Sequence, residues 1–304
     1  MEMENGTAVQ EFTLEGFPDI QHLGKFLFLV HLLTYLASIA GNAVIVTIIC
    51  ANSRLQTPMY FFLSIFSFVE CCFINTVIPK LLVIFLLGKQ NISFPACFIQ
   101  AFFFFFLGAA DFFLIAVMSL DRYVAICKPL HYLTIMNLKT CSFLVTTCFT
   151  LAFTLITAIH TGLMLRLNFC GPNVITHFFC EVPPLLLLSC SSTYVNSIMI
   201  VLADAFYGIL NFLMTIVSYG FIISSILKMR TAEGKKKAFS TCSSHLIVVC
   251  MYYTAVFYAY ISPVSSYSPG KSKLAGVLYT ILSPTLNPLI YTLRNKEVKA
   301  ALRK

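Results

Sequence analysis

The chain has 304 residues and a formal net charge of +8, yet 59% of its residues are hydrophobic and only 11% are charged. Soluble domains carry roughly 25% charged residues, so this composition excludes an ordinary soluble protein. Nucleic-acid binding is a poor explanation for the positive charge of so apolar a chain, because membrane topology accounts for it. We therefore expect an integral membrane protein.

Apolar stretches long enough to cross a bilayer, which takes about 20 residues per helix, recur along the chain. They cover residues 25–50, 59–86, 97–120, 140–164, 197–227, 238–261 and 273–292. The sequence thus predicts an all-α membrane protein. Its parts are an extracellular segment over 1–24, a bundle of seven transmembrane helices over 25–292 and a short amphipathic cytoplasmic helix or tail over 293–304.

Residues 1–24 contain no Lys or Arg, so they lack the basic region of a cleavable signal peptide, and the first span is expected to serve as the insertion signal. With the N-terminus outside, most Lys and Arg fall in segments inside the cell, as the positive-inside rule requires. Asn5 and Asn91 begin glycosylation sequons. Asn5 is the better candidate, because Asn91 lies in a short loop close to the lipid.

Two acids stand about half way through the bilayer, Glu70 in the second span and Asp111 in the third. Lys and Arg are absent at matching depth, so the acids need protons or a cation. A sodium ion would find further oxygen ligands in Ser67 and Asn287. A protonated, hydrogen-bonded structural pair is the equal alternative.

The third span ends in Asp121 and Arg122, where a hydrophobic helix should be leaving lipid. Charges near hydrocarbon are tolerated where they face a bundle interior or mark a function. The pair therefore suggests a two-state lock.

Cysteines at the outer ends of the spans face an oxidising exterior, where two disulfides are expected. These cysteines are Cys97 at the start of the third span, and Cys170, Cys180 and Cys190 in the loop before the fifth.

Polar side chains recur at helical spacing on several spans, which predicts either a wet interior or hydrogen bonds between helices worth about 1 kcal/mol each. Pro284 and Pro288 should give the seventh helix room to bend. The stripes are Ser38 and Asn42; Asp204, Tyr207, Asn211, Thr215 and Ser218; His245, Tyr252, Tyr253 and Tyr260; and Thr280, Ser283, Asn287 and Tyr291.

Several motifs, taken together, resemble those of olfactory receptors, which are rhodopsin-like G-protein-coupled receptors. They are LQTPMYFFL at 55–63, MSLDRYVAIC at 118–127, Ser218-Tyr219, KAFSTCSSHL at 237–246 and NPLIYTLRN at 287–295. The loop pieces at 169–173 and 178–180 are similar to the tetrapod-type branch. The chain departs from the family at Gln56, where His is usual, and at Leu120, where Tyr is usual; neither departure touches the charged pair.

The resemblance implies disulfides Cys97–Cys180 and Cys170–Cys190 and a cation site at Glu70 and Asp111. It implies a stimulatory, olfactory-type G protein, a cAMP response and a place in the plasma membrane of olfactory cilia. The implied activation switch comprises Asp121, Arg122, Tyr219, His245, Tyr253, Asn287, Pro288 and Tyr291. The run Lys235–Lys237 would suit an acidic partner surface or anionic lipid.

A small volatile ligand is expected in the outer half of the bundle, bound mainly by burial of apolar surface. Asp204 is the ionisable member of this lining and either contacts ligand or pairs with a tyrosine, so odorants that carry a hydroxyl or amine donor are favoured over carboxylic acids. The expected lining is Phe104, Phe105, Gly108, Ala109, Phe112, Ala203, Asp204, Tyr207, Val256, Phe257, Tyr260, Val277 and Thr280.

Rival functions have weaker support. A transporter would favour internal repeats, which we do not find, whereas a receptor of the same fold for a non-olfactory ligand is a nearer alternative. Ser240, Cys242 and His245 lack the supporting arrangement of an enzyme site, so no enzyme is expected. The segment 177–181 resembles a proposed copper-binding signature, but a disulfide at Cys180 would remove its thiolate.

Overall fold

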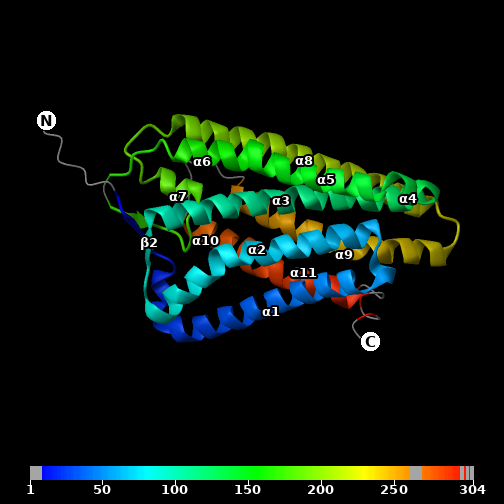
Figure 1. Cartoon of the computed structure of the whole chain (residues 1–304), viewed down its shortest axis with the longest axis horizontal. Coiled ribbons are helices and arrows are strands. Elements are labelled where there is room, and N and C mark those ends of the chain that lie inside the picture. The colour runs from blue at the N-terminus through cyan, green and yellow to red at the C-terminus, as the bar shows by residue number, and fades with distance from the viewer. Residues whose placement is uncertain (1–8, 171, 261–268, 295–297, 299–300, 302–304) are drawn as a thin grey trace, which may run out of the picture.

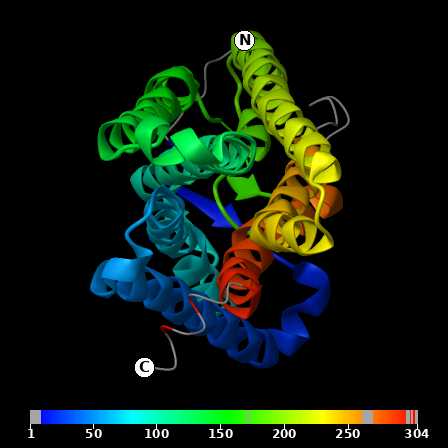
Figure 2. The same ribbon diagram turned by 90° about the vertical axis from the view of Figure 1, so that its right-hand side faces the viewer.

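The computed structural model describes residues 9–170, 172–260, 269–294, 298 and 301. Its long helices lie side by side along one axis (Figure 1), and a view along that axis shows them nearly end-on (Figure 2). The helices are α1 (Gly24–Ala51), α2 (Pro58–Leu87), α3 (Phe94–Cys127), α4 (Tyr132–Ile135), α5 (Leu138–Leu151), α6 (Ala158–Met164), α7 (Val182–Leu186), α8 (Tyr194–Lys228), α9 (Ala232–Tyr260), α10 (Pro269–Val277) and α11 (Ser283–Arg294).

The remaining elements are short. The strands are β1 (Glu11–Leu14), β2 (Asn91–Ser93) and β3 (Val174–Ile175); the 3-10 turns are η1 (Pro18–Leu23), η2 (Ser53–Leu55) and η3 (Pro129–His131); and the π-helical turns are η4 (Ala152–Thr157) and η6 (Leu278–Leu282).

The seven-span bundle is confirmed, with α5–η4–α6 as the fourth span and α10–η6–α11 as the seventh. Within the described ranges, six helical stretches are long and apolar enough to cross a membrane, and α9 adds a shorter apolar stretch at Cys242–Ala255. Helix α9 begins at Ala232, before the expected span, so the run Lys235–Lys237 lies on its first turns. The proposed C-terminal helix falls almost wholly outside the described residues.

Local sequence signals explain where α2 and α3 begin and end. Pro58 opens α2, where its missing N–H costs no helical hydrogen bond, and Gly88 ends that helix with a φ of 64°, a conformation that glycine adopts without strain. Ser93 caps α3 by accepting a hydrogen bond from the backbone N–H of Ala96. The loop between α2 and α3 is therefore tight and holds their outer ends together.

The seventh helix contains the π-helical turn η6 just before Pro284, one of the two prolines expected to give this helix room to bend. Because proline has no N–H to donate to the preceding turn, the helix widens there instead of continuing its regular hydrogen bonds. The turn places buried Tyr279 and Thr280 inside the bundle.

A three-stranded sheet closes one end of the bundle, opposite α4 (Figure 1). Strand β1 pairs antiparallel with β2 and parallel with β3, and its Phe12 and Leu14 are 1% and 0% exposed. Only an extracellular segment was expected over residues 1–24, so this strand was not predicted. Alternation of apolar residues at Phe12 and Leu14 is the signal that predicts it.

Two disulfides hold the loop before α8, one joining it to the bundle at the same end and the other closing the loop on itself. Cys97 at the start of α3 is bonded to Cys180, and Cys170 is bonded to Cys190, the pairs implied by the resemblance. Both cysteines of the first bridge are buried. The bridge therefore fixes the loop over the interior of the bundle.

Replacing Cys97 or Cys180 by serine should abolish surface expression, because loss of a native disulfide costs about 2–5 kcal/mol. Cys50→Ser is the matched control, since Cys50 is a free, exposed cysteine on α1. Staining of an epitope-tagged chain on intact cells measures the effect. Equal staining of the Cys97 variant and the parent would contradict the structural role of the bridge.

Candidate functional site

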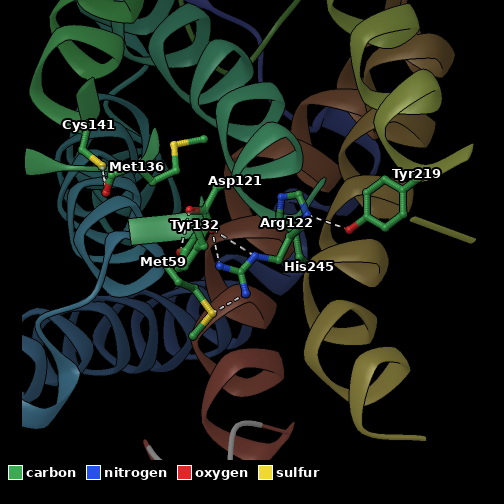
Figure 3. Close-up of polar contacts among 8 residues, drawn as sticks. All are labelled: Met59, Asp121, Arg122, Tyr132, Met136, Cys141, Tyr219 and His245. Carbon is green, nitrogen blue, oxygen red and sulfur yellow. Dashed lines mark hydrogen bonds and ion pairs between the residues drawn. The ribbon is translucent and has the colours of Figure 1, made fainter. Parts of the chain in front are cut away.

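The inner end of α3 carries a closed ion pair between Asp121 and Arg122, both buried (Figure 3). Arg122 also donates from Nη1 to the Sδ atom of Met59 at 2.7 Å, and the Tyr132 hydroxyl donates to Oδ1 of Asp121 at 2.8 Å. A buried charge is costly unless it is paired and hydrogen-bonded. These contacts satisfy that condition and hold the arginine against α2 and α4.

Tyr132 and Met59 also contact this ion pair, although neither was among the expected switch residues. Tyr132 begins the short helix α4, which returns to the end of α3 immediately after the turn η3. Burial, and then the adjacent Asp121 carboxylate, raise the pKa of Tyr132. Its hydroxyl therefore stays protonated and can donate to Asp121. Met59 lies inside the matched motif at 55–63, but no local pattern there indicates a contact with Arg122.

Tyr219 of α8 and His245 of α9 form a second inner contact, with the tyrosine hydroxyl 2.7 Å from Nδ1 of the histidine (Figure 3). The Tyr291 hydroxyl is buried and has no hydrogen-bond partner among the described residues. Arg122 and Tyr291 both lie within electrostatic range of Tyr219. Of the expected switch residues, Tyr219, His245 and Tyr291 thus lie near Arg122, but Arg122 bonds to Asp121 and not to either tyrosine. Tyr253 and Asn287 lie further out, at mid-depth.

The two mid-membrane acids are fully buried between α2, α3 and α11. Nδ2 of Asn287 donates to Oε1 of Glu70 at 2.6 Å, and Asp111 lies within electrostatic range of Glu70. Oδ1 of Asp111 and Oδ1 of Asn287 are buried without a hydrogen-bond partner among the described residues. Orphaned oxygens beside two carboxylates are the donor set that a hard cation such as sodium prefers. The residues therefore fit the cation expected from the sequence.

Two tyrosines of α9 join it to the neighbouring helices at mid-depth. The Tyr252 hydroxyl donates to the Gly108 carbonyl at 3.1 Å, and the Tyr253 hydroxyl lies 2.5 Å from Oδ1 of Asn211 and 3.0 Å from Oγ1 of Thr215. Nδ2 of Asn211 in turn donates to the Phe112 carbonyl at 3.0 Å. These polar residues therefore form hydrogen bonds between helices α3, α8 and α9.

The outer half of α3 lies beneath a lid formed by the disulfide-tethered loop. Phe179 packs on Phe104 with ring centroids 4.7 Å apart, and Tyr279 packs on Phe104 at 5.7 Å. Phe178 is buried so closely against α10 that a Cβ atom at Gly276 would meet its ring at 3.0 Å. Phe179 and Tyr279 were not among the expected lining residues, because loop folding and the π turn, not helical spacing, place them there.

The other expected lining residues divide into three groups. The Phe112 ring centroid lies 5.9 Å from that of Tyr252 and 5.5 Å from that of Tyr253. Gly108, whose carbonyl accepts from Tyr252, is on the same side of α3. Phe105 instead stacks on His160 of α6. Ala109, Ala203 and Thr280 are buried, and Tyr207 and Val277 are half-buried. The side chains of Asp204, Val256, Phe257 and Tyr260 lie outside the described residues, as does Asn5.

His177 and Glu181 flank the lid but do not form a charged pair. Burial lowers the pKa of His177 to about 3, so the imidazole is neutral, and its Nε2 lies 3.8 Å from Oε2 of Glu181. The Tyr279 hydroxyl donates to Oε1 of Glu181 at 3.3 Å. Because Cys180 is in a disulfide, it offers no thiolate to copper.

Comparison with known proteins identifies the family. The profile described as "Olfactory receptor" matches residues 31–304. Human olfactory receptor 13A1 is 61% identical over 99% of this chain and 92% of that protein, and human olfactory receptor 13G1 is 46% identical over 99% and 97%. The crystal structure of squid rhodopsin matches the fold with a TM-score of 0.69 at 16% identity, over 93% of this chain and 85% of that one. The chain therefore belongs to the olfactory receptors, a family of G-protein-coupled signalling receptors and not of enzymes.

Proposed function

We propose that this olfactory receptor binds a small volatile odorant in the outer half of its bundle and activates a stimulatory, olfactory-type G protein, raising cAMP. The observation that carries the proposal is the closed Asp121–Arg122 lock at the inner end of α3, whose outer end carries Phe104 beneath the lid. One rigid helix thus connects the two ends. The proposed setting is the plasma membrane of olfactory cilia, with the N-terminus outside and Asn5 glycosylated.

Activation requires the bundle to have two packings that the odorant distinguishes. The described contacts support this, because α9 is attached through Tyr252 to the Gly108 carbonyl and through Tyr253 to α8. An odorant that displaces α9 from α3 in the outer half would shift the inner end of α9, where His245 holds Tyr219. Arg122 would then leave Asp121, and the G protein would enter the opened inner face.

The proposed odorant carries a hydroxyl or amine donor on a compact apolar body. The aromatic side chains Phe104 and Phe112 line the outer half, and burial of apolar surface supplies about 25 cal/mol per Å². Asp204, placed on α8 by the backbone, is the proposed polar contact. The expected lining contains no Lys or Arg to receive a carboxylate.

A sodium ion is the proposed partner of the acid pair. Glu70, Asp111 and the free Oδ1 of Asn287 would hold it, and its charge would allow both carboxylates to be ionised. Since Asn287 precedes Pro288 on α11, the site joins α2 and α3 to the inner part of the seventh helix. A cation held there would favour the closed packing.

Tyr132→Phe should raise basal signalling, because it removes the hydroxyl that holds Asp121 while keeping the ring. A hydrogen bond to a charged group contributes about 1.5 kcal/mol, so the lock equilibrium should shift by roughly tenfold. Basal cAMP, normalised to surface staining, measures it, with Tyr194→Phe as control because Tyr194 is 71% exposed at the outer end of α8. Basal cAMP equal to that of the parent would refute the role of Tyr132.

Gly108→Ala tests the position of the odorant. A Cβ atom there would meet only the Phe73 ring, at 3.5 Å, an ordinary contact, so folding should be unaffected. The added methyl should weaken the response to tightly fitting agonists by about tenfold, the usual effect of one methylene in an apolar pocket. Dose–response curves measure the change, and Gly220→Ala is the control because nothing lies within 4 Å of its Cβ position. Unchanged potency for every agonist would place the ligand elsewhere.

Asp111→Asn should change basal signalling or its sodium sensitivity without altering which odorants activate the receptor. The amide keeps the shape of the side chain but removes the charge that a cation would neutralise. Basal cAMP at graded sodium concentrations and equal surface level measures the effect. The cation site is ruled out if basal activity, sodium response and maximal signal all match the parent.

A further inference from the structure

A groove runs along the outer half of the bundle between α2 and α3, with a volume of about 770 Å³. It lies on a different face of α3 from the proposed odorant site, since Phe103 and Leu107 line it whereas Phe104 and Gly108 face the lid and α9. Lys80 of α2 and Ala96, Ile99 and Gln100 of α3 also belong to its lining.

The wall of the groove on α3 is apolar except for Gln100, and it faces lipid. It extends from Ala96 to Leu107, roughly 17 Å at 1.5 Å of rise per residue. Ile99 and Phe103 are 57% and 45% exposed, so no helix of the described residues covers this wall. A concave apolar wall of this length matches an extended hydrocarbon chain lying along the helix.

The outer part of the groove is polar and cationic. Lys80 is the charged residue of the lining, and its ammonium donates to the carbonyls of Lys89 and Asn91 at 3.0 and 2.5 Å. An ammonium has three donors, so one remains for an occupant. The nearby acid Glu11 accepts from the side-chain amide of Asn91, and Lys80 has no ion pair among the described residues. The uncompensated charge favours an anionic head group.

We propose that this groove binds a long-chain fatty acid from the outer leaflet, with its carboxylate on Lys80 and its chain along α3. The carboxylate would form a charge-assisted hydrogen bond with the half-buried Lys80 ammonium. The hydrocarbon chain would cover the exposed apolar side chains of α3.

Occupancy of the groove would reach the odorant site through Gln100. Its Nε2 donates to the Thr76 carbonyl at 2.8 Å, and its Oε1 accepts from the backbone N–H of Cys180 at 2.9 Å. Phe179, the residue before Cys180, packs on Phe104. A hydrocarbon chain that displaces Gln100 would therefore move the lid over Phe104. The bound fatty acid would thereby change the potency of the odorant.

The test uses the full-length receptor in phosphatidylcholine nanodiscs with a photoreactive diazirine analogue of palmitic acid. We expect saturable labelling of peptides that carry the groove residues of α2 and α3. Palmitate should compete for the site, whereas palmityl alcohol, which has the same chain and no charge, should compete much less. If cholesterol competed better than palmitate, the proposal would be overturned in favour of a sterol site. Labelling that does not saturate would also overturn it, because it would show that the groove only contacts bulk lipid.

Variants separate charge from shape. Lys80→Gln, which keeps donors for the two carbonyls, should weaken binding about tenfold through loss of the charge-assisted contact, whereas Lys80→Arg should preserve it. Lys89→Gln is the matched control, because Lys89 is exposed on the loop that follows α2 and does not line the groove. Ala96→Trp should block the groove from its lipid-facing wall without entering the core. Labelling of Lys80→Gln and Ala96→Trp equal to that of the parent would overturn the proposal, whether or not the receptor responds to odorants.

Discussion

The rest of the structure depends on the cost of burying charge in a medium without water. Helix α3 carries Asp111, Asp121 and Arg122 through the interior, and each must be neutralised or hydrogen-bonded where it lies. At the inner end Arg122 and Tyr132 satisfy Asp121. At mid-depth two carboxylates share one region, and oxygens of Asp111 and Asn287 remain unsatisfied. The first site is stable as a closed pair, whereas the second requires a proton or a cation.

Under the proposed function, this difference makes α3 the helix that connects the odorant site to the inner face. Tyr219 and Tyr291 lie within electrostatic range of one another and of Arg122, so a packing that separated Arg122 from Asp121 would offer it two tyrosine hydroxyls. The polar residues above it connect α3 to α8 and α9 through hydrogen bonds, so these helices cannot shift independently. Packed interfaces of this kind have discrete arrangements, which is why a small displacement outside can be transmitted inside.

The outer end obeys a different constraint, because there the chain returns to water and an oxidising environment. The Cys97–Cys180 bridge, the three-stranded sheet and the packing of Phe178 against Gly276 all fix the loop over the bundle. Gln100 binds the same loop from the side of α2. The groove between α2 and α3 is therefore connected through Gln100 to the loop that covers Phe104.

The sequence by itself determined the membrane class, the seven spans, the disulfide cysteines and the placement of the charged pair, because these follow from composition, from period and from motifs that are contiguous in the chain. Tertiary structure alone decided which partners satisfy those groups. Met59 and Tyr132 meet Arg122 and Asp121, and Phe179 covers Phe104, through contacts between segments that no periodicity relates. Strand β1 likewise exists because β2 and β3 offer it hydrogen bonds. Burial is a collective property of several segments, and so the identity of each buried partner emerges only when the whole bundle is assembled.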